Sequence, residues 1–137
     1  HSDLDIDVED SAYLILGFNS NEFGNDQGAS LNLDFIRHDT TRRCIVIGDK
    51  GTLCWNGVEG TVNFFPSFEK EWIELYSEKL DLDFTYQEEL KHFFFCVKNG
   101  DSTVVTGEDG LSALKVVDAA KKSSETGQEV FLPSNVI

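Results

Sequence analysis

The sequence predicts an α+β domain, in which the first half of the chain supplies a mainly antiparallel sheet and later helices pack on one face of it. Two observations predict this class. Up to about Ser77, short apolar stretches without helical spacing alternate with turn residues, a pattern typical of strands. From Tyr86 onward, apolar residues recur at helical spacing. Strands followed by helices indicate the α+β class.

Composition limits the classes of partner. The chain has 137 residues, of which 40% are hydrophobic, so we expect residues 1–137 to form a single domain with its own core. The formal net charge of −14 disfavours nucleic acid and anionic membrane as direct partners, because both attract basic surfaces. No apolar run approaches the roughly 20 residues that cross a bilayer.

The first half contains the predicted strands. Residues 29–37 alternate, with Leu31, Leu33 and Phe35 on one face. Residues 43–57 predict two short strands around the turn GDKG. Residues 19–28 predict a polar loop. The other predicted strands are residues 10–18, 60–66 and 71–77, with a last short one at 128–133.

The second half predicts two helices. The first carries an apolar stripe and ends at Asn99-Gly100, because glycine commonly follows a helix C-terminus. Thr106 is the expected N-cap of the second helix, with Glu108 and Asp109 in its first turn. The stripe of the first helix is Tyr86, Leu90, Phe93, Phe94 and Val97. The predicted buried stripe of the second is Ala113, Val116, Val117 and Ala120.

The three cysteines are expected to be reduced, which favours a cytoplasmic protein. Cys44 and Cys54 flank the predicted GDKG turn. Its register sets Cys44 against Trp55 and Ile45 against Cys54, so the two sulfurs point to opposite faces of the sheet. A bulge of one residue would change that register.

Most motifs with a chemical pattern have a simpler structural interpretation. His92 and Cys96 lie one helical turn apart, but two ligands are too few for structural zinc, and we expect no metal site. Cys96 is expected at the core edge and His92 toward solvent. Asp34 and His38 have the spacing of an acid–base pair only on a helix, whereas these residues predict a strand. Gly-rich nucleotide-binding motifs and nucleophile motifs are missing, so we expect no catalytic and no cofactor-binding residue in this chain.

The concentrated positive charge lies at Arg37, Arg42 and Arg43. Solvated strand ends are one interpretation of these arginines. An anion site is the other, because guanidinium groups suit bidentate contact with phosphate or carboxylate.

The order of the motifs resembles a known family. DVEDSAYLIL near the start, GASLNLDFIRHDTTRRCIVIGDKGTLCWNG in the middle, and the run from the Tyr86 helix through TGEDGLSALKVVDAA resemble the C-terminal domain of the Gfo/Idh/MocA family of sugar oxidoreductases. The likeness runs from about Asp7 to Leu132. The family's Glu-Lys-Pro and Asp-x-x-x-His motifs are not carried over, because Glu69-Lys70 lacks the proline and Asp34…His38 lies in a predicted strand.

The resemblance implies a piece of a two-domain enzyme that lacks its N-terminal Rossmann domain. The parent would be an NAD(P)-dependent sugar dehydrogenase or reductase, using NAD or NADP on a sugar or nucleotide-sugar hydroxyl or ketone. This piece, inactive alone, would carry an open sheet whose free face meets a second subunit in a homo-oligomer. It would also supply part of the substrate pocket, for which we select Arg37, Arg42 and Tyr86 as candidate substrate-binding residues.

Two other classes stay open from the sequence. One is a stand-alone acidic interaction or binding domain without enzymatic activity. The other is a small cone-shaped α+β enzyme or binder with a polar pocket inside a curved sheet. A Rossmann fingerprint encoded upstream would favour the oxidoreductase, and a large pocket enclosed by the sheet would favour the cone-shaped protein.

Overall fold

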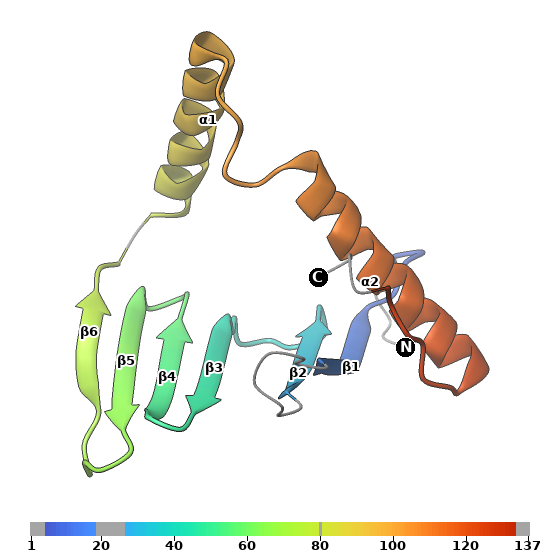
Figure 1. The fold of residues 1–137 in the computed structure, drawn as a ribbon, viewed down its shortest axis with the longest axis horizontal. Helices are drawn as coiled ribbons and strands as arrows, with labels where there is room; N and C mark the ends of the chain where they lie inside the picture. Colours follow the sequence, from blue (N-terminus) through green and yellow to red (C-terminus); the bar gives the residue numbers. More distant parts are fainter. Residues whose placement is uncertain (1–4, 19–26, 80, 134–137) are drawn as a thin grey trace. The chain divides into compact units, whose positions relative to one another are not determined.

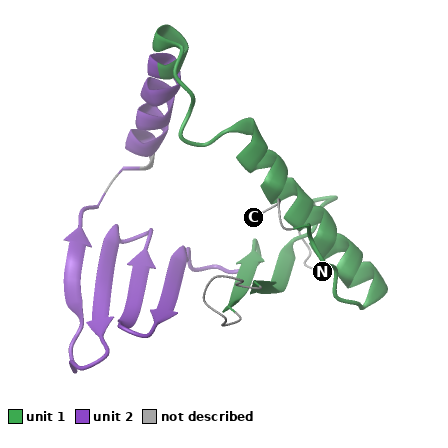
Figure 2. Ribbon diagram, in the orientation of Figure 1, with its two compact units in different colours: residues 1–36, 96–137 green, residues 37–95 purple. Residues whose placement is uncertain are grey.

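A computed structural model describes residues 5–18, 27–79 and 81–133 of the chain. The chain divides into two compact units, residues 1–36 with 96–137 and residues 37–95 (Figure 2). The division falls inside helix α1, Leu82–Asn99. The single domain predicted for residues 1–137 stays a prediction.

The first unit contains the strand pair β1, Ser11–Phe18, and β2, Gln27–Asp34 (Figure 1). The strands are antiparallel, with Leu14 opposite Leu31. Because side chains alternate, Ala12, Leu14 and Leu16 are half-buried on one face, whereas Ile15 on the other face is 93% exposed. The strand predicted at 10–18 is confirmed.

The strand predicted at residues 29–37 is correct in position but wrong in its bounds. Strand β2 ends at Asp34, and the backbone N–H of Phe35 donates to the carbonyl of Asp10 at 2.9 Å, which closes the ladder. Residues 36 and 37 lie beyond that bond and outside the strand. Strand β2 also begins at Gln27, inside the predicted polar loop. The remainder of that loop, residues 19–26, lies outside the described residues.

The second unit contains an antiparallel sheet of four strands in the order β3-β4-β5-β6. Glycines close the β3–β4 hairpin at the predicted GDKG turn. The register shifts after Val62 on β5, so Leu75 is an extra residue on β6 at this point. The strands are β3, Arg43–Gly48; β4, Gly51–Asn56; β5, Thr61–Pro66; and β6, Ile73–Ser77.

The register confirms the prediction for the cysteines. Cys44 lies opposite Trp55 and Ile45 opposite Cys54, so the two thiols belong to opposite faces. All three cysteines are free, with Cys44 exposed and Cys54 and Cys96 buried.

Helix α1 begins one turn before Tyr86. Asp81 starts it, because its carboxylate Oδ1 accepts the backbone N–H of Asp83 at 3.3 Å. It ends as predicted at Asn99, followed by Gly100 in the left-handed region at φ 71°.

The apolar stripe predicted for α1 is exposed, which corrects its expected burial. Tyr86, Leu90, Phe93, Phe94 and Val97 are each more than half exposed. Helical periodicity identifies an apolar face but not what covers it. The segment that follows the helix covers a different face.

Helix α2, Gly107–Thr126, has the N-cap that the sequence predicts. Thr106 Oγ1 accepts the backbone N–H of Asp109 at 3.2 Å, and Asp109 Oδ2 accepts the backbone N–H of Thr106 at 2.8 Å. Gly127 ends the helix in the left-handed region at φ 67°.

The buried stripe predicted for α2 is only half correct. Val116 and Ala120 are half-buried, whereas Ala113 and Val117 are exposed. The other half-buried positions of the helix are Ser112, Lys115, Ala119 and Ser123, so the protected face is not the purely apolar stripe that the sequence predicts.

The strand predicted at residues 128–133 is wrong. This segment is irregular, and it lines a shallow groove of about 280 Å³ together with α2. Half-buried Val130 and Leu132 face that groove, so their apolar character is used in packing on a helix and not in a ladder.

The α+β class is confirmed by two helices and two open, antiparallel sheets among the described residues. The packing of helices on one sheet face stays a prediction. Within the same residues, we find no helix with the length and apolar character needed to cross a membrane.

Candidate substrate-contact segment

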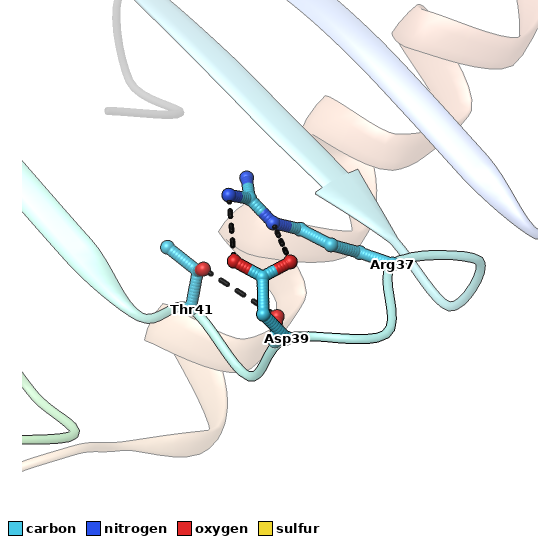
Figure 3. Close-up of polar contacts among 3 residues, drawn as sticks. All are labelled: Arg37, Asp39 and Thr41. Atoms are coloured by element: carbon cyan, nitrogen blue, oxygen red, sulfur yellow. Dashed lines mark hydrogen bonds and ion pairs between the residues drawn. The ribbon is translucent and has the colours of Figure 1, made fainter.

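Two of the selected residues, Arg37 and Arg42, lie in the connection that leads into β3, which we call the arginine segment, residues 37–42. Arg37 forms a fork with Asp39: its Nε lies 2.8 Å from Oδ1 and its Nη2 3.0 Å from Oδ2 (Figure 3). Thr41 Oγ1 donates to the carbonyl oxygen of Asp39 at 3.5 Å. The hydrogen bond from Arg37 lowers the pKa of Asp39 below its ordinary value. The bidentate edge of Arg37 is therefore used inside the segment.

Arg42 has a different environment. The central carbon of its guanidinium group lies over the indole of Trp55, 5.4 Å from the ring centroid. The carbonyl of Arg42 accepts the backbone N–H of Gly57 at 2.8 Å, which continues the β3–β4 pairing by one step. Arg42 is therefore held by its backbone and by its side chain.

Gly57 is fitted to this contact. A Cβ atom at this position would lie 2.6 Å from Trp55 Cζ2 and 3.2 Å from Arg42 Cδ. The first distance is shorter than any ordinary carbon contact, so Gly57, Trp55 and Arg42 pack as one layer that excludes a side chain at residue 57.

The third arginine of the cluster points to the opposite face. Arg43 Nε donates to Cys54 Sγ at 3.1 Å, and Cys54 is only 7% exposed. Because side chains alternate along a strand, Arg43 and Arg42 diverge. The structure thus separates three arginines that are adjacent or nearly so in sequence.

Tyr86 lies on a separate element, the second turn of α1, and its side chain is 64% exposed. The structure groups Arg37 and Arg42 in one segment and places Tyr86 outside it. Sequence reasoning missed Asp39, Trp55 and Gly57, which fix the two arginines. The predicted hairpin register contained the signal, since it places Trp55 opposite Cys44, two residues after Arg42.

Cys96 lies where the structural interpretation predicts, whereas His92 does not. Cys96 is 3% exposed, and its thiol donates to the carbonyl of Ser102 at 3.5 Å. The chain leaving α1 turns back over this face, with the backbone N–H of Asp101 donating to the carbonyl of Cys96 at 3.0 Å. His92, expected toward solvent, is half-buried. Residues 5–18, 27–79 and 81–133 contain no group of three or more His, Cys, Asp or Glu suited to hold a metal ion.

The residues described do not form a Rossmann-type site for a nicotinamide dinucleotide. Such a site uses a glycine-rich turn between a parallel strand and the N-terminus of a helix, where the helix dipole favours the negative pyrophosphate. Among the described elements the sheets are antiparallel, and acids occupy the first turns of both helices, Asp83 in α1 and Glu108 with Asp109 in α2. We therefore assign no step of a reaction to a cofactor held here.

Comparison with known proteins decides the family. Residues 2–132 match the family described as "Oxidoreductase family, C-terminal alpha/beta domain", of the Gfo/Idh/MocA group. The chain belongs to this family. It is also similar to a myo-inositol 2-dehydrogenase of Thermotoga maritima, with 31% identity over 134 aligned positions and a coverage of 90% of this chain.

The extent of that similarity matters for function. The chain spans 36% of the length of the Thermotoga maritima dehydrogenase. No solved structure gives a significant match. The resemblance found from the motifs in Asp7–Leu132 is thereby confirmed at the level of the family and its C-terminal domain.

Proposed function

We propose that this chain is the substrate-binding and oligomerisation part of an NAD(P)-dependent oxidoreductase that acts on a hydroxyl or ketone of a sugar or nucleotide-sugar. The match of residues 2–132 to the oxidoreductase C-terminal domain carries the proposal. The similarity to a dehydrogenase named for myo-inositol supports a polyol or sugar substrate. The redox step would belong to an N-terminal Rossmann domain outside this sequence, which binds NAD or NADP.

Arg37, Arg42 and Tyr86 are proposed to form part of the substrate pocket, Arg42 and Tyr86 by direct contact and Arg37 through the position of its segment. The arginine segment supports this proposal because two cations there are held in defined conformations, one by Asp39 and one by Trp55. Fixed donors contribute more to substrate orientation than mobile ones, since less conformational entropy is lost on binding.

A homo-oligomer through one open sheet face is the second part of the proposal. One face of the four-stranded sheet carries an apolar row, in which Val46, Leu53, Phe64 and Ile73 lie opposite one another across four strands. Val46, Leu53 and Ile73 in this row are exposed. A continuous apolar row of this kind suits a subunit contact.

Light scattering tests the interface. Val46→Glu places a charge in the apolar row, and Ile47→Glu places the same charge on the neighbouring residue of β3, which faces the other way. We expect Val46→Glu to lower the molar mass of the assembly, because a charge in the apolar row opposes contact between subunits. Ile47→Glu should leave that molar mass unchanged. Equal masses for both variants would contradict the assignment of this face.

A cytoplasmic location is also proposed, on the ground that the three cysteines are free and that the two on the hairpin belong to opposite faces.

Turnover by the complete protein that contains this chain tests the proposed activity. Formation of reduced nicotinamide would be followed with myo-inositol, other neutral polyols and nucleotide-sugars, each with NAD and with NADP. We expect turnover of at least one polyol or nucleotide-sugar by the complete protein. An inactive complete protein with a well-folded Rossmann domain would argue instead for a binding domain without enzymatic activity.

A further inference from the structure

The two arginines of the arginine segment differ in which part of the guanidinium group is available. A guanidinium carries its N–H donors around the edge of a plane, and a forked contact with a carboxylate uses that edge. Asp39 takes two donors of Arg37, Nε and Nη2. Arg42 instead contacts Trp55 through its guanidinium group and has no ion pair among the residues that the structure describes. Contact with a ring leaves the edge donors in place for a ligand.

The surroundings of Arg42 are arranged to keep that edge in position. The bond from Gly57 N–H to the carbonyl of Arg42 fixes its backbone at 2.8 Å. The absence of a side chain at Gly57 lets Trp55 and Arg42 pack together. A side chain so held has already lost much of its rotamer freedom, which lowers the entropy cost of binding a ligand.

Nearby carboxylates are engaged elsewhere. Asp39 is paired with Arg37, and Glu59 in the turn after β4 accepts a hydrogen bond from Asn56 Nδ2 at 2.8 Å. Asn56 Oδ1 also accepts the backbone N–H groups of Val58 and Glu59, which fixes that turn. The acids closest in sequence to Arg42 and to its Trp55 partner therefore have partners of their own.

We propose that Arg42 is the residue that binds an oxyanion of the substrate, a phosphate or a carboxylate, and that Arg37 is a positioning residue that shapes the segment through Asp39. This inference rests on the proposed function and specifies the substrate as one that carries an anionic group. It divides two roles that the sequence assigned jointly.

Fluorescence of Trp55 reports directly on this contact. Trp72, which lies edge-on to Phe65 at 5.4 Å, would be replaced by Phe so that Trp55 is the remaining indole. The chain would be titrated with inorganic phosphate and, separately, with acetate, against sodium chloride at equal ionic strength. A saturable change of fluorescence with phosphate alone indicates that the substrate carries a phosphate group. A saturable change with acetate indicates that it carries a carboxylate.

Variants separate the two arginines. Arg42→Ala is expected to weaken anion binding about tenfold or more, and Arg42→Lys to weaken it less than Arg42→Ala, because an ammonium keeps the charge but not the fork. Arg37→Ala is expected to keep the affinity for the anion within about threefold of that of the unsubstituted chain. The charged hydrogen bond that this variant loses is to Asp39 and not to the ligand. Lys50→Ala, which removes one exposed charge at the far end of the hairpin, is the matched control.

The inference is overturned if the Trp55 fluorescence of the chain with native arginines shows no saturable change with either anion. It is also overturned if Arg37→Ala weakens anion binding as much as Arg42→Ala does. Gly57→Ala gives a second test, since it should displace the indole and weaken anion binding while circular dichroism stays that of the parent. Turnover of a neutral polyol with unchanged KM in Arg42→Ala would overturn this inference and leave the proposed function standing. If the complete protein binds anions at Arg42 but turns over no nicotinamide, the proposed oxidoreductase function is contradicted and anion binding by Arg42 still holds.

Discussion

Three arginines within seven residues have three different environments in this protein. Arg37 pairs with a carboxylate, Arg42 contacts an indole, and Arg43 contacts a buried thiol. Strand alternation accounts for the divergence of Arg42 and Arg43, because neighbouring side chains on an extended chain point to opposite faces. The divergence makes each arginine separately testable.

The pKa of Asp39 tests the Arg37 contact. Its hydrogen bond with Arg37 lowers that pKa, so the ion pair is fully formed above the ordinary carboxyl value and is lost as pH falls through the lowered pKa. Carboxyl titration by NMR should show the pKa of Asp39 rising toward its ordinary value in Arg37→Ala. An unchanged pKa in that variant would show that the fork is not formed in solution. Arg42→Ala serves as the control and should leave the Asp39 titration unchanged.

Thiol reactivity tests the burial of the cysteines. Cys44 is exposed, whereas Cys54 and Cys96 are buried, so a thiol reagent should modify one cysteine quickly and the other two only on unfolding. Under mild oxidation, mass spectrometry should find no Cys44–Cys54 disulfide, because the two side chains belong to opposite faces. Detection of that disulfide in the folded chain would contradict the register of β3 and β4.

At the residue scale, the sequence predicted which residues of the hairpin share a face, but not which side chains form hydrogen bonds or ion pairs with each other. The register of the GDKG hairpin follows from the turn, which is why the cysteine assignment is confirmed. The pairing of Arg37 with Asp39 depends on the path of residues 35–42 after β2 ends, and no periodicity determines that path.

Local signals define the elements well. The N-cap at Thr106 and the glycine that ends α1 were predictable because each depends on a few adjacent residues. The burial of helix faces was not predictable from the sequence, because it depends on which segment of the folded chain covers each face. Cys96 is buried by the chain that follows its own helix, and the Tyr86–Val97 stripe is not.

Removal of the cap measures its contribution to the stability of α2. Thr106→Ala deletes the hydroxyl that accepts the Asp109 N–H and should lower the free energy of unfolding by about 1 kcal/mol, measured by urea denaturation. Thr106→Ser keeps the hydroxyl and should retain most of the stability. The pKa of Asp109 is lowered by its bonds with Thr106, so its share of the capping box is present above the ordinary value and is lost in acid. Equal stability of the Ala and Ser variants would contradict the cap.

For the whole molecule, the order of strands and helices predicted the α+β class, and the resemblance of the motifs within residues 7–132 indicated the family. The last predicted strand failed because residues 128–133 are apolar but line a groove with α2. Apolar character predicts burial of a segment, whereas a ladder also needs a free strand edge beside it. The chain spans 36% of the length of the Thermotoga maritima relative, so the activity of the complete protein stays a proposal.

The central proposal is that this chain contributes to the substrate side of an oxidoreductase and not to the cofactor side. Steady-state kinetics of the complete protein with Arg42→Ala, varying substrate and dinucleotide in turn, test it most directly. The account predicts that KM for the sugar substrate rises about tenfold while KM for NAD or NADP stays unchanged. A rise in the dinucleotide KM with an unchanged substrate KM would contradict it.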